Sequence, residues 1–259
     1  MGVTVYEDFY KSEYQKALYS ADDALEFRTK LLNIFASNSA TTWIEAKQIE
    51  ERFKKVQIEN ITSKPPTMVG VDLSVRDDFS TVTYNLYSVD SRSFHSYTDY
   101  YFPDGALEKH PNCELYKGWV KAGYLKLCKG DIIDYQQIVD DILKMANYLC
   151  IMGIGYDPYK SAEFVNLLSS SVGGEADIIN PVKQTYGTFT SPVESFEIAI
   201  YSNKISFDPN PITPYCFANA ILDEDRNCNK KPIKKTHNAK IDSTITNLMT
   251  FHLFNNLTS

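Results

Sequence analysis

Three strand-like segments separated by short breaks lie between residues 69 and 102. In 69–73, Val and Leu alternate with Gly70 and Asp72, while 81–89 and 93–102 are rich in β-branched and aromatic residues. Strands joined by so few residues pair antiparallel, because a parallel pair needs a crossover of about a dozen residues or more. The pattern therefore predicts an antiparallel meander, with the Asp72 side chain on the opposite face from Val and Leu.

An alternation of helices and strands follows the meander. An amphipathic helix over 135–149 leads into an apolar run over 149–156, which is typical of a buried strand. The later patterns predict a helix over 161–168, a strand over 175–182, a helix beginning at Ser191-Pro192 and a closing helix over 241–254. This order of elements is that of an RNase H-like α/β fold, a mixed sheet flanked by helices.

The segment before the meander has a different character. Helical patterns run over about 20–35 and from Thr42 onward, and Pro65-Pro66 ends them. We therefore predict that residues 1–65 form an N-terminal helical arm and that residues 66–259 form the α/β domain.

Composition excludes several classes of protein. The chain has 259 residues, of which 43% are hydrophobic, and is long enough for one sizeable core. Its five cysteines form no CxxC pair, which argues against a disulfide framework or a zinc knuckle and favours free thiols in the cytoplasm. No apolar run approaches the roughly 20 residues of a membrane span, and no secretory signal opens the chain. We expect a cytoplasmic protein without a membrane partner.

Three aspartates stand where predicted elements end or begin. Asp72 lies at the end of the first strand, Asp157 follows the apolar run, and Asp242 opens the closing helix. If they converge, their carboxylates suit two Mg²⁺ or Mn²⁺ ions about 3.5–4 Å apart, a centre that hydrolyses phosphodiesters. Individually, Asp157 could cap a helix and Asp242 could favour a helix dipole. Asp72 has no such simple role, because aspartate is depleted in strands.

A basic segment precedes Asp242. The net charge of −7 speaks against nucleic acid as a partner, yet residues 226–240 hold six basic residues and no acidic one. Such a segment is either a solvated loop or a phosphate-binding surface, and its position before Asp242 favours phosphate. The lysines that we predict to contact DNA are Lys231, Lys234, Lys235 and Lys240.

Seven short motifs follow one another along the chain: Gly70-Val71-Asp72-Leu73-Ser74 with Asp78, Tyr116-Lys117-Gly118-Trp119, Gly123-Tyr124-Leu125, Gly130-Asp131-Ile132-Ile133-Asp134, Tyr156-Asp157-Pro158-Tyr159, Asn210-Pro211 with Asn219, and 231–242. With these motifs in this order, residues 24–252 resemble the nuclease domain of the large terminase subunit of tailed phages. The resemblance implies an RNase H-like endonuclease that cuts double-stranded viral DNA during packaging. It assigns the metal ligands to Asp72, Asp157 and Asp242, with Asp78 as a possible outer-shell carboxylate.

The resemblance also implies partners. In this family the nuclease works beside a motor ATPase, a small terminase subunit and the portal, in the cytoplasm of the host of a phage or prophage. The segment 26–33 resembles the connection from the ATPase into the nuclease, but no GxxxxGK[ST] motif is present, so we expect no ATPase activity from this chain. The segment before Asn210 also lacks the histidine found in many relatives.

Two alternatives remain open at this point. The first is another RNase H-like nuclease, of the resolvase or transposase kind, which would prefer branched DNA. The second is a packaging-assembly module whose acidic residues no longer bind metal.

Overall fold

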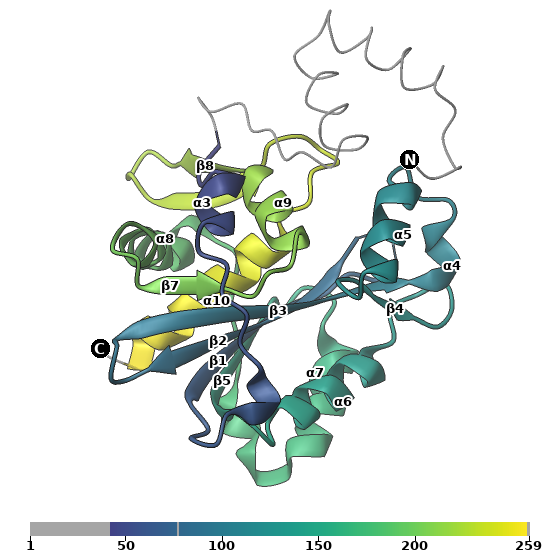
Figure 1. Ribbon diagram of the computed structural model, residues 1–259, viewed down its shortest axis with the longest axis horizontal. Helices are drawn as coiled ribbons and strands as arrows, with labels where there is room; N and C mark the ends of the chain where they lie inside the picture. Colours follow the sequence, from purple (N-terminus) through teal and green to yellow (C-terminus); the bar gives the residue numbers. More distant parts are fainter. Residues whose placement is uncertain (1–41, 77, 258–259) are drawn as a thin grey trace, which may run out of the picture.

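A seven-stranded sheet lies at the centre of the protein, with helices against both of its faces (Figure 1). The computed structural model describes residues 42–76 and 78–257. Along the sheet the strands follow the order β4, β3, β2, β1, β5, β6, and β7 pairs with β3. The bounds are Pro66–Asp72 (β1), Ser80–Ser88 (β2), Ser93–Pro103 (β3), Lys126–Cys128 (β4), Cys150–Tyr156 (β5), Ile179–Pro181 (β6) and Ile205–Phe207 (β7).

Helices α6 and α7 cover one face of this sheet, and α8 and α10 cover the other (Figure 1). A separate hairpin, β8 and β9, packs beside α8. The remaining bounds are Ala46–Glu50 (α3), Ile58–Asn60 (η2), Asp104–Leu107 (α4), Cys113–Lys121 (α5), Tyr135–Met145 (α6), Ala162–Val172 (α7), Gly173–Ile178 (η3), Tyr186–Tyr201 (α8), Ile212–Ala218 (α9), Ala220–Glu224 (β8), Lys230–Lys234 (β9) and Asp242–Leu257 (α10). Among the helices described, none is long and apolar enough to cross a membrane.

The predicted meander is confirmed. β1 pairs antiparallel with β2, and β2 pairs antiparallel with β3. The predicted helix before the apolar run is α6, and the run itself is β5, which pairs parallel with β1. A parallel partner requires a crossover, and α6 lies in that crossover. The mixed α/β sheet flanked by helices is therefore confirmed.

Alternation along β1 divides its side chains between two apolar layers. Val69 and Val71 pack with α6 and α7, whereas Met68 packs with α8 and α10. Gly70 also faces α10, which approaches so closely that a Cβ at position 70 would lie 2.2 Å from the Thr246 carbonyl oxygen. A glycine within a strand often marks such a close backbone approach.

The predicted start of one helix is wrong. α8 begins at Tyr186, not at Ser191, and Thr185 caps it by accepting a hydrogen bond from the Thr188 amide at 3.2 Å. Pro192 therefore lies inside the helix, where its missing N–H leaves the Thr188 carbonyl without its usual partner. The His252 side chain on α10 interacts with that carbonyl, which opposes the lowering of the pKa of His252 by burial. The proline, which favours the first turn of a helix when judged locally, is thus accommodated inside the helix.

The predicted N-terminal arm lies mostly outside the described residues, and the boundary at residues 65 and 66 stays a prediction. The helix predicted from Thr42 onward is shorter than expected: in the structure it is α3, which begins at Ala46 and ends at Glu50. Beyond it, Phe53 bridges to Phe207 of β7, and Ile44 and Ile49 are buried in the core beneath α8. Residues 43–53 are thus packed into the α/β core.

His95 gives the fold a measurable response to acid. It lies on β3, and its Nδ1 is 3.0 Å from Ser206 Oγ on β7. Burial, followed by the charge of Lys54, lowers the pKa of His95 to about 4. The imidazole of His95 binds a proton below about pH 6.5 in the unfolded chain but only near pH 4 in the native protein. The contribution of His95 to the free energy of unfolding is therefore fully present above pH 6.5 and is lost as the pH falls toward 4.

We expect this loss to amount to about 2–3 kcal/mol, because each pKa unit corresponds to about 1.4 kcal/mol. In His95→Gln, urea unfolding at pH 7 and at pH 4.5 should give more similar free energies than in the wild type. His237→Gln serves as the control, because His237 is exposed. An unchanged pH dependence in His95→Gln would contradict the assignment.

Candidate metal centre

The first two aspartates meet at one edge of the sheet. Asp72 is the last residue of β1, and Asp157 directly follows β5. These strands run parallel, with Val71 opposite Tyr156, so the two aspartates leave the sheet side by side. Burial, then the charges of Asp157 and Asp78, raises the pKa of Asp72 to about 7.

Asp242 reaches the same place from the helical layer. It is the first residue of α10, and it is 6% exposed. The close approach of α10 to Gly70 brings the start of the helix over the end of β1. Burial, then the charges of Asp78 and Asp72, raises the pKa of Asp242 well above its ordinary range. The structure therefore brings the three predicted aspartates to one region.

Asp157 already has hydrogen-bond partners. Its Oδ1 accepts from the Tyr159 amide at 2.9 Å, and its Oδ2 accepts from Gln184 Nε2 at 2.6 Å. The first contact closes a local turn of the kind expected for an aspartate before proline. The side chain is half-buried.

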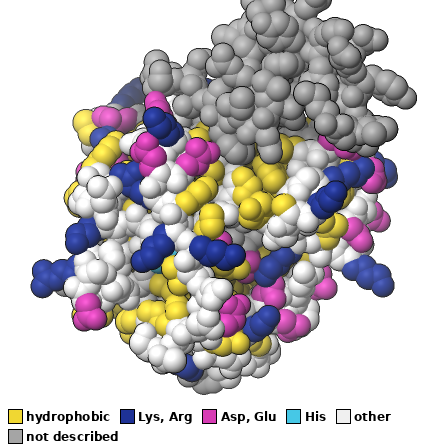
Figure 2. Space-filling model, in the orientation of Figure 1, with side chains coloured by type: hydrophobic (Ala, Val, Ile, Leu, Met, Phe, Trp, Pro, Cys, Tyr) yellow, Lys and Arg dark blue, Asp and Glu magenta, His cyan; other side chains and the backbone are white. Residues whose placement is uncertain are grey.

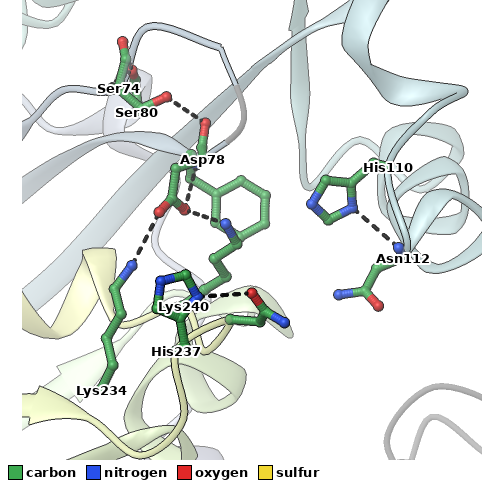
Figure 3. A network of polar contacts seen from close by, with 10 residues as sticks. Ser74, Asp78, Ser80, His110, Asn112, Lys234, His237 and Lys240 are labelled. Atoms are coloured by element: carbon green, nitrogen blue, oxygen red, sulfur yellow. Dashed lines mark hydrogen bonds and ion pairs between the residues drawn. The ribbon is translucent and has the colours of Figure 1, made fainter.

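Asp78 is held by two lysines (Figure 3). Lys234 Nζ lies 3.1 Å from Asp78 Oδ2, and Lys240 Nζ lies 2.9 Å from Asp78 Oδ1. Asp78 is also fixed through its backbone, because Ser74 Oγ donates to its carbonyl at 2.7 Å. The two ammonium groups place positive charge among the carboxylates and oppose the rise in the pKa of Asp242.

The middle of the basic segment is a strand, β9, and its two ends are turns and loop. Lys231 and Lys234 lie on β9, which packs beside α8, and Lys231 Nζ stands 4.6 Å from the centre of the Tyr186 ring. Lys235 follows the strand, and its amide donates to Asn219. Lys240 is 9% exposed. In the face of the molecule in Figure 2, Lys and Arg side chains alternate with Asp and Glu and form no continuous basic patch.

In their present positions the carboxylates are too far apart to coordinate one metal ion together. Over residues 42–76 and 78–257, no three His, Cys, Asp or Glu side chains are grouped tightly enough to hold a metal ion as they stand. The oxygen chemistry nonetheless fits a divalent cation. Asp242 Oδ2 is buried and has no hydrogen-bond partner within this part of the chain, and an unpaired buried carboxylate oxygen is costly unless a cation or donor satisfies it.

Sequence reasoning missed two features of this region. The ion pairs of Asp78 with Lys234 and Lys240 join residues more than 150 positions apart, and no local pattern indicates them. The close approach at Gly70 did leave a signal, because a glycine stands between two valines in a strand.

Comparison with known proteins gives concordant matches. A family model described as "Terminase large subunit, endonuclease domain" matches residues 3–256. Protein YmfN of Escherichia coli (strain K12) is 27% identical over 267 residues, which cover 96% of this chain and 56% of YmfN.

The crystal structure of the HK97 bacteriophage large terminase superimposes with a TM-score of 0.71 at 18% identity, covering 98% of this chain and 52% of that one. This likeness confirms the RNase H-like fold. The chain spans little more than half the length of either relative.

Proposed function

This chain belongs to the family of terminase large subunit endonuclease domains, and on that premise we propose that it cuts double-stranded DNA with divalent metal ions bound by Asp72, Asp157 and Asp242. The observation that carries the proposal is the convergence of these carboxylates at the ends of β1 and β5 and the start of α10. The family match sets aside a resolvase or transposase.

The metal ligands follow from the chemistry of the site. Asp72, Asp157 and Asp242 would hold two Mg²⁺ or Mn²⁺ ions, with Asp78 as an outer-shell carboxylate. When bound, such ions activate a water molecule and stabilise the leaving oxygen of a phosphodiester. Metal ligands must be ionised, so Asp72, whose pKa is raised to about 7, would hold the cation in its deprotonated form.

Asp157 would hold the cation with the oxygen that now accepts a hydrogen bond from Gln184. Lys234 and Lys240 keep Asp78 oriented and limit the repulsion between carboxylates before metal binds. Gln184 and the two lysines are therefore positioning residues in this proposal.

Lysines on and after β9 would contact DNA phosphates. Lys231, Lys234, Lys235 and Lys240 precede Asp242 along the chain, and two of them already lie at the carboxylates. Phosphate contacts provide affinity without sequence preference, so binding should weaken steeply with salt. By family membership, the ATPase region, the small terminase subunit and the portal are proposed as partners.

Cleavage of plasmid DNA tests the function. We expect the purified protein to nick and linearise supercoiled plasmid in Mn²⁺ or Mg²⁺ and to leave it intact in EDTA. Equal cutting with EDTA would exclude the metal mechanism, and an absence of cutting by folded, metal-bound protein would exclude the nuclease.

A second candidate, a packaging-assembly module without catalysis, is favoured by one observation. Asp78 is already neutralised by two lysines, and within the described residues no closed group of metal ligands is preformed. This alternative predicts that Mn²⁺ does not raise the melting temperature, whereas a bound ion stabilises the native state by mass action.

A further inference from the structure

Helix α10 and strand β2 are joined by polar side chains in a regular ladder. Asn85 Nδ2 donates to Thr250 Oγ1 at 3.0 Å, and Thr83 Oγ1 lies 2.6 Å from Thr246 Oγ1. The helix advances four residues per step, about 6 Å, and the strand two residues, about 6.7 Å. Because these rises are nearly equal, the ladder stays in register along the interface.

One more step of the ladder pairs Thr81 with Asp242. Thr81 is 0% exposed and Asp242 is 6% exposed. Thr81 Oγ1 and Asp242 Oδ2 are both buried, and neither has a hydrogen-bond partner in residues 42–76 and 78–257. The contact that the register leads one to expect is therefore missing only at the end of the ladder beside the carboxylates.

The neighbours of Thr81 show which way its side chain faces. In the sheet Thr81 stands directly between Asp72 on β1 and Tyr100 on β3. Residues opposite one another in antiparallel strands share a face, and Tyr100 reaches Thr213 of α9 at 2.8 Å on the α10 side. Thr81 thus presents its hydroxyl to the space bounded by Asp72 and Asp242.

We propose that Thr81 is a positioning residue of the metal centre, whose hydroxyl accepts a hydrogen bond from a water molecule carried by the cation at Asp242 Oδ2. The inference rests on the proposed function and adds to it a residue outside the acidic set. Mg²⁺ and Mn²⁺ suit such an arrangement, because small hard cations keep part of their hydration shell when carboxylates bind them. Such a hydrated cation would satisfy both unpaired oxygens at once, the ion at Asp242 Oδ2 and its water at Thr81 Oγ1.

Thr81→Val tests this role, because it removes the hydroxyl and keeps the shape. In EDTA the variant should melt at or above the wild-type temperature, since an unpaired buried hydroxyl is replaced by a methyl group. Mn²⁺ binding, measured by titration calorimetry with the metal alone, should weaken about tenfold, the usual effect of losing an outer-shell partner. Thr81→Ser, which restores the hydroxyl, should recover most of the affinity.

Thr83→Val is the matched control one step along the same strand. The Thr83 hydroxyl is paired with Thr98 at 3.0 Å and with Thr246. Its loss should lower the melting temperature in EDTA and leave Mn²⁺ affinity within about twofold of the wild type, because the site lies one ladder step away. Thr81→Val is therefore expected to lose metal affinity and keep metal-free stability, whereas Thr83→Val is expected to lose stability and keep metal affinity.

The outcomes separate this inference from the proposed function. Unchanged Mn²⁺ affinity in Thr81→Val, or a fall in metal-free melting temperature equal to that of Thr83→Val, would overturn it. A wild-type protein that binds no Mn²⁺ would overturn it together with the metal centre. Weakened Mn²⁺ binding in Thr81→Val, in a protein that cuts no DNA, would overturn the nuclease alone and support the role of Thr81.

Discussion

Asp72→Asn is expected to abolish metal-dependent DNA cleavage and, in the absence of metal, to make the protein more stable than the wild type at pH 8. Loss of a direct ligand should reduce the cleavage rate more than about 100-fold, because even outer-shell partners of metal ligands contribute about 10- to 100-fold. Plasmid cleavage in Mn²⁺ and thermal melting in EDTA measure the two effects.

The gain in stability follows from the direction of the pKa shift. Folding raises the pKa of Asp72 from 3.8 to about 7, through burial and then the charges of Asp157 and Asp78. The native state therefore holds this proton more tightly, and metal-free stability falls as pH rises from about 4 through 7. Asparagine removes the ionisation, so the variant should be more stable at pH 8 by on the order of 2–4 kcal/mol.

Asp90→Asn is a suitable control, because Asp90 is exposed in the turn between β2 and β3. It should keep both the activity and the pH dependence of the wild type. Cleavage retained by Asp72→Asn would remove Asp72 from the metal centre. Joint loss of stability and activity would instead identify a structural role.

Gly70→Ala is expected to have the largest effect on folding. The added Cβ would lie 2.2 Å from the Thr246 carbonyl oxygen, which belongs to the backbone of α10 and cannot rotate away. The helix must therefore move off the sheet. Overpacking of this kind costs about 3 kcal/mol or more, which lowers the melting temperature of a protein of this size by about 6–12 °C.

The same movement should weaken the metal centre, because Asp242 opens the displaced helix while Asp72 stays on β1. Circular dichroism and Mn²⁺ calorimetry of Gly70→Ala report the two consequences. Gly118→Ala is the control, since a Cβ at Gly118 meets nothing within 4 Å and alanine within a helix adds about 0.5–1 kcal/mol. A Gly70→Ala protein as stable as the wild type would show that α10 is not seated tightly against β1.

Local sequence patterns predicted much of the fold. Alternation in 69–73 and the β-branched runs after it indicated β1 to β3, and the apolar run before Asp157 indicated β5. These patterns can be recognised in the sequence because the two-residue alternation of side chains in a strand, and the short connections between strands, depend only on residues that are near one another in the chain. The same patterns put Asp72, Asp157 and Asp242 at element ends, where the structure has them.

Local patterns failed where a distant partner decides the outcome. Pro192 was placed at the start of a helix, yet it lies inside α8, where the Thr188 carbonyl that it leaves unpaired interacts with His252 of α10. The sequence analysis predicted no strand in the basic segment, yet residues 230–234 form β9, which pairs with the neighbouring β8. The contacts of this segment with phosphate stay a prediction.

By itself the sequence indicated strands β1 to β3 and β5, helices α6, α7 and α10, the family, and the aspartates that stand at the ends of β1 and β5 and at the start of α10. Only the tertiary structure decided their environment: the burial of Asp242, the lysines at Asp78, and the unpaired oxygens of Thr81 and Asp242. The reason is physical. Backbone conformation responds to residues a few positions away, whereas the charge state and solvation of a carboxylate depend on everything that packs around it.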